Sequence, residues 1–210
     1  NGGDVIVCDT PAGKTYEMFD AFESRVILRL TGDFGPEQSD PVAMARHAVA
    51  RIRTLDPVRH DRLLIRVNAF MDESRFLTDA RLEDIADTNA EIIPTNCELQ
   101  QIAIQRDSPP ARMPRYIIDS GLWNKIDNVS RAYLILHEAI YYEAILRGDY
   151  DSREARLLNG YLASKAFESW TTEQYVKFLA PLYHLPPRKR VNGVDLMADS
   201  LKFYDSGEVM

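Results

Sequence analysis

One long apolar segment limits what this chain can fold into. From Val129 to Arg147 the residues are apolar on almost every side of a helical projection, and Gly148 follows at the position where glycine commonly ends a helix. A helix that is apolar all round lies inside a domain, since no side of it is suited to water. We therefore expect a buried central helix over residues 129–147, surrounded by the other elements.

The remaining elements are shorter. Apolar residues recur at helical spacing over 15–30, 41–52, 57–70, 82–85, 154–167 and 171–183. Strand-like runs occupy 5–7, 97–105 and 115–118. We find no internal repeat, low-complexity tract or clear linker, so we expect one domain over residues 1–210. Its fold class is mainly α with a small β element (α+β).

The N-terminal residue and the two cysteines give information on the cellular compartment of the protein. The chain begins at Asn1 without Met, which indicates a removed signal peptide or a trimmed expression product. A disulfide between Cys8 and Cys97 would tie the first strand to the middle of the chain in an oxidising compartment, and two reduced buried thiols are the alternative. No apolar run approaches the roughly 18 residues of a membrane span, so we expect no membrane insertion.

Charge excludes one class of partner. The chain has 32 acidic and 25 basic residues among 210, a formal net charge of -7. A negative surface repels phosphate backbones, so we expect no nucleic acid to bind. The sequence also lacks the glycine-rich phosphate-binding motifs and the Gly-x-Ser-x-Gly nucleophile motif, and we expect no cofactor.

Two carboxylates near the end of the central helix are the candidate catalytic pair. Glu143 lies in the last turn of an apolar helix, where burial and the helix dipole disfavour its charged form, as a general acid requires. Glu154 lies 11 residues further on, near the start of the next helix, where a carboxylate stays ionised. Glycoside hydrolysis uses such a division of roles between two acids.

His137-Glu138 is the start of a zinc-protease pattern, but the position of the second histidine holds Tyr141. We therefore expect no metal. The alternative interpretation is that His137 is a hydrogen-bonded core histidine, with Glu138 paired to Arg131 or Tyr142 on neighbouring turns.

The arrangement of a helix with a glutamate near its end, a short loop and a second carboxylate resembles the lysozyme superfamily. Within it, the chain resembles the secreted lysozymes of predatory bacteria that cleave deacetylated peptidoglycan. The resemblance covers residues 129–167 and implies that Glu143 is the general acid and Glu154 the second carboxylate. Ala144 stands where the transglycosylase branch has serine, which argues against a transglycosylase.

The leading hypothesis is therefore a secreted or periplasmic glycoside hydrolase, active as a monomer on peptidoglycan. The acidity favours the deacetylated polymer, whose free amines are positive. The first alternative is a non-catalytic binding or inhibitor module of the cell envelope, in which both glutamates are surface groups. The second is a metalloenzyme built on His137-Glu138.

Overall fold

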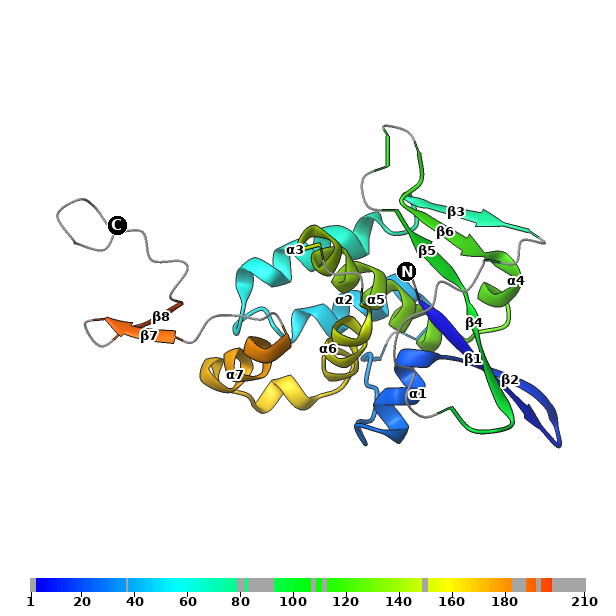
Figure 1. The fold of residues 1–210 in the computed structure, drawn as a ribbon, viewed down its shortest axis with the longest axis horizontal. Coiled ribbons are helices and arrows are strands. Elements are labelled where there is room, and N and C mark those ends of the chain that lie inside the picture. The colour runs from blue at the N-terminus through cyan, green and yellow to red at the C-terminus, as the bar shows by residue number, and fades with distance from the viewer. Residues whose placement is uncertain are drawn as a thin grey trace. The chain divides into compact units, whose positions relative to one another are not determined.

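The computed structural model describes residues 3–36, 38–78, 82, 93–106, 109–110, 113–148 and 151–182, and the backbone of 188–191 and 194–197. The chain divides into two compact units, residues 1–169 and 170–210, and each is described by itself. About 50% of the chain is helical and 19% is strand, which confirms the α+β class (Figure 1). The expected single domain over 1–210 stays a prediction, and the expected helix at 82–85 falls outside the described residues apart from Leu82.

The first unit is built around the helix α5 (Asn128–Leu146), which confirms the expected central helix. Its buried residues point in every direction, and Figure 1 shows it in the middle of the other helices. The elements that pack against it are α1 (Phe19–Val26), α2 (Pro41–Ala50), α3 (Pro57–Ala69), α6 (Arg153–Ala163) and β2 (Gly13–Met18). Because α5 has neighbours on all sides, its polar side chains must find partners inside the protein.

Aspartates begin most of these helices. The side chains of Asp40, Asp56 and Asp127 accept hydrogen bonds from the first-turn amides of α2, α3 and α5. Asp119 does the same for the short helix α4 (Ser120–Trp123). An N-terminal aspartate satisfies an unpaired amide and favours the positive end of the helix dipole, so part of the protein's acidity has a structural role.

Two small sheets accompany the helices. The first has the order β2-β1-β4, with β1 (Asp4–Thr10) in the centre and antiparallel to both β2 and β4 (Cys97–Gln101). The second has the order β3-β6-β5, in which β6 (Tyr116–Asp119) pairs parallel with β3 (Ser74–Leu77) and antiparallel with β5 (Ala103–Gln105). Residue 102 separates β4 from β5, so one stretch of chain serves both sheets.

Two expectations about these segments are wrong. Residues 15–30 do not form one helix, because 13–18 pair with β1 as a hairpin and only 19–26 are helical. Residues 97–105 form two strands in different sheets instead of one. In both cases, long-range pairing with β1 or β6 overrides the local apolar pattern.

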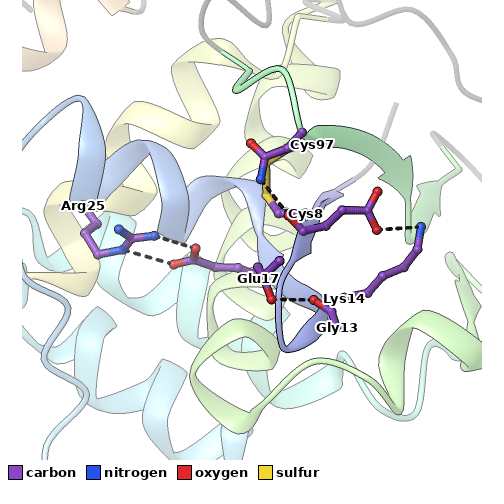
Figure 2. Close-up of a disulfide and its surroundings, with 9 residues drawn as sticks. Cys8, Gly13, Lys14, Glu17, Arg25 and Cys97 are labelled. Carbon is purple, nitrogen blue, oxygen red and sulfur yellow. Dashed lines mark hydrogen bonds and ion pairs between the residues drawn. A yellow bond between two sulfur atoms is a disulfide. The ribbon is translucent and has the colours of Figure 1, made fainter.

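A disulfide joins Cys8 of β1 to Cys97 of β4, which confirms the expected bridge. The two residues are directly opposite each other in the antiparallel register, with their Cα atoms 4.0 Å apart (Figure 2). Both cysteines pack against a small cluster of Ile6, Phe19 and Phe22, and an ion pair between Arg25 and Glu17 lies nearby. The bridge therefore fixes the register of the first sheet.

The 3-10 helix η1 (Ala166–Ser169) ends the first unit. The second unit contains α7 (Thr172–Leu182) and a hairpin of β7 (Arg188–Val191) and β8 (Val194–Met197). Trp170 packs edge-on against Phe178 at the start of this unit. Among the described residues of the whole chain, none of the helices combines the length and the hydropathy of a membrane span.

Replacing both Cys8 and Cys97 by serine should lower the free energy of unfolding by about 4 kcal/mol, because the bridge closes a loop of 89 residues in the unfolded chain. Urea denaturation followed by circular dichroism measures this loss. Reduced wild-type protein is the control and should be destabilised to a similar extent. A change below about 1 kcal/mol would contradict the structural role of the bridge.

Candidate functional site

Glu143, the predicted general acid, faces α3. Its Oε2 accepts a hydrogen bond from Arg59 Nε at 3.0 Å, and its Oε1 accepts one from Arg62 Nε at 3.1 Å. Arg59 and Glu143 are both buried, whereas the side chain of Arg62 is 58% exposed. Each oxygen of the carboxylate is thus held by its own guanidinium, which is the geometry of a charge-assisted pair.

Glu154, the predicted second carboxylate, lies in the first turn of α6, as expected. Its side chain is 16% exposed, and its Oε2 is 3.7 Å from a guanidinium nitrogen of Arg147 at the end of α5. The two glutamates therefore have separate basic partners, the arginines of α3 for Glu143 and Arg147 for Glu154. Their role as a catalytic pair stays a prediction.

The setting of Glu143 differs from the one that the sequence suggested. The expectation of a general acid rested on an apolar helix without a nearby cation. Helix α3 supplies two cations, because Arg59 and Arg62 are three residues apart and lie on the same side of that helix. The i, i+3 spacing of Arg59 and Arg62 is visible in the sequence. Nothing in the sequence indicates that the two arginines face Glu143 on α5.

His137 lies in the core. Its Nδ1 is 2.9 Å from Oδ2 of Asp20 on α1, and Asn159 on α6 donates a second hydrogen bond to the same oxygen. Burial opposes the charged imidazole, but the carboxylate of Asp20 prevails and raises the pKa of His137 to about 9. The interpretation of His137 as a hydrogen-bonded core histidine is confirmed. Its partner Asp20, and Asn159 that binds the same carboxylate, were not expected from the sequence.

Glu138 is fully buried. Its Oε1 accepts a hydrogen bond from the backbone amide of Gly3 at 2.9 Å, and it is not paired with Arg131, which instead contacts Trp123 and Asn128. Burial raises the pKa of Glu138 to about 7. Glu138 therefore titrates near neutral pH without being accessible to a large substrate.

A second charged cluster lies where α3, α5 and β6 meet. Arg66 and Arg115 both bind Glu73, and their guanidinium groups stack on the ring of Tyr142 at 5.1 and 4.6 Å from its centroid. Cation–π contacts of this kind hold an aromatic ring in place. Tyr142 is one turn from Glu138 on α5, so this cluster lies on the same side of that helix as the buried glutamate.

Histidine, cysteine, aspartate and glutamate side chains do not gather into a metal site within the described residues, since no group of three or more of them could hold a metal ion. For His137, the ring nitrogen nearest to a carboxylate is already used by Asp20.

Comparison with known proteins identifies no related protein. The chain matches no known protein family, no curated protein sequence and no solved structure.

Stability should fall as the pH rises from about 5 to about 9. His137 and Glu138 both bind a proton more tightly in the folded protein than in the unfolded chain, where their ordinary pKa values of 6.5 and 4.5 apply. Deprotonation therefore costs more in the folded state, and we expect the free energy of unfolding to fall by about 5–6 kcal/mol over this range, roughly half of it from each group.

Urea denaturation at a series of pH values measures this slope. Asp20→Asn is the matched variant, because it removes the carboxylate that raises the pKa of His137. In that variant the part of the decline between about pH 6.5 and 9 should disappear. A wild-type stability that rises over the same interval would refute the assignment.

Glu143→Gln should lower the free energy of unfolding by about 2 kcal/mol, because it removes the shortest ionic contact of the buried Arg59. Glu154→Gln should cost less, about 1 kcal/mol, since its ion pair with Arg147 is longer, at 3.7 Å. Parallel urea denaturation of the two variants makes the comparison. Equal losses would show that Glu143 is not a structural ion pair.

Proposed function

We propose that the protein is a non-catalytic binding domain that is secreted or periplasmic. The observation that carries this proposal is the pairing of both oxygens of Glu143 with Arg59 and Arg62. A general acid must release a proton to a leaving group, and a carboxylate that is held by two guanidinium groups is better suited to a structural role.

The other buried titratable groups support the same conclusion. His137 and Asp20 hold each other in the core, and Glu138 is covered completely. A catalytic group must come within hydrogen-bond reach of its substrate, and these side chains are closed off from a polymer. The disulfide supports an oxidising compartment, where a bridge of this kind persists.

The partner we propose is a cationic cell-wall polymer such as deacetylated peptidoglycan. The net charge of -7 attracts free amino groups over distances of about a Debye length, so the binding should weaken as salt is added. Acetylated peptidoglycan lacks these amines and should bind less.

The rival function is the glycosidase of the leading sequence hypothesis, with Glu143 as the acid and Glu154 as the second carboxylate. Co-sedimentation and turbidity clearing with purified cell walls, native and chemically deacetylated, separate the two functions. We expect salt-sensitive binding to deacetylated walls without clearing.

Glu154→Gln is the decisive variant for the rival, because the substitution should leave the fold nearly as stable as wild type. Clearing by the wild-type protein that is lost in Glu154→Gln would overturn the binding proposal in favour of the glycosidase. Equal sedimentation with native and deacetylated walls, or none with either, would refute the proposed partner.

A further inference from the structure

Among the buried polar atoms that meet no hydrogen-bond partner within the described residues, four belong to three side chains of α5, β5 and β6. They are Oε2 of Glu138, the hydroxyl of Tyr116, and both Oε1 and Nε2 of Gln105. Tyr116 and Glu138 are 0% exposed and Gln105 is 6% exposed. A buried polar atom without a hydrogen-bond partner is costly, so a group of four requires an explanation.

The fold directs these side chains toward one region. Gln105 and Tyr116 are opposite each other in the antiparallel pair β5–β6, so their side chains project from the same face of the sheet. Ala103, two residues before Gln105, shares that face, and its amide binds the carbonyl of Gly3. The amide of Gly3 in turn binds Glu138. Gly3 thus connects the buried glutamate with the strand that carries Gln105.

Electrostatics gives a second link between the two side chains. Burial raises the pKa of Tyr116, and the charge of Glu138 raises it further, which places the carboxylate near the phenol. Glu73, Arg66 and Arg115 also act on this hydroxyl, but the two arginines are bound to Glu73.

Glu138 differs from the other acids of the core in its partners. Asp20 has His137 and Glu143 has two arginines. Within the described part of the chain, no basic side chain lies at ion-pair distance from Glu138. The charges of His137 and of the N-terminal amino group favour the ionised carboxylate, but the Nδ1 of His137 is directed to Asp20. A buried carboxylate without a counter-ion in direct contact is costly, so a cation bound next to Glu138 would stabilise it.

We propose that Glu138 Oε2, the Tyr116 hydroxyl and Gln105 Oε1 form a binding site for a small monovalent cation. All three donors are oxygens, which suit hard cations such as sodium, potassium or ammonium. The site has a single carboxylate, so one positive charge balances it, whereas a divalent ion would leave a net charge in the interior. This proposal is independent of the proposed function.

The test is the thermal unfolding of the intact, disulfide-bonded protein in sodium, potassium, ammonium or choline chloride at equal ionic strength and about pH 8.5, where Glu138 is ionised. Choline is too large for a buried site. We expect at least one of the small cations to raise the unfolding midpoint above its value in choline. At ten times its dissociation constant, the ion should increase the folding equilibrium constant about tenfold.

Two variants locate the effect. Glu138→Gln removes the charge, and Tyr116→Phe removes one oxygen while it keeps the packed ring, so at least one of them should fold. Both should lose the difference between small cations and choline. Tyr133→Phe, another buried tyrosine, is the matched control and should retain it. Equal midpoints in all four salts would mean that the atoms hold only water and would overturn the proposal, as would a cation effect that survives Tyr116→Phe.

Discussion

The burial of α5 on every side is the constraint on which the rest of the structure depends. A helix without a solvent-facing side must satisfy its polar groups through other elements. The hydroxyl of Ser130 accepts a hydrogen bond from the backbone amide of Met18, at the junction of β2 and α1. The imidazole of His137 binds the carboxylate of Asp20 on α1. Glu138 binds the backbone before β1, and Glu143 binds α3. Each of these four residues therefore ties a different part of the chain to the core.

The sequence was sufficient to predict the elements whose signals are local. The apolar stretch up to Gly148 predicted α5, and the prolines after Asp40 and Asp56 marked the starts of α2 and α3. Residues 15–18 were assigned to a helix because the apolar spacing over 15–30 resembles one, whereas their structure is set by pairing with β1. A pairing partner at a distance leaves no local signal, and this also explains why 97–105 were not divided between two sheets.

The same limit applies to the candidate site. The position of Glu143 near the end of a buried helix was predictable, but its chemical setting depends on Arg59, which is 84 residues away. His137 was expected to be a core residue with a hydrogen bond, and its partner Asp20 is 117 residues away. Residue type and spacing can therefore identify candidate acids and bases. Which charged side chain lies next to each candidate is decided by the tertiary fold.

The position of β1 at the centre of its sheet has a consequence for synthesis. The hairpin of β1 and β2 is complete after 18 residues, but β4 reaches the growing chain some 80 residues later. At the usual rate of translation, about 5–20 residues per second, Cys8 waits for roughly 4–16 s before its partner exists. With only two cysteines in the chain, no wrong intramolecular pair can form during this delay. The disulfide can therefore form only after β4, the last strand of the sheet in chain order, has been synthesised.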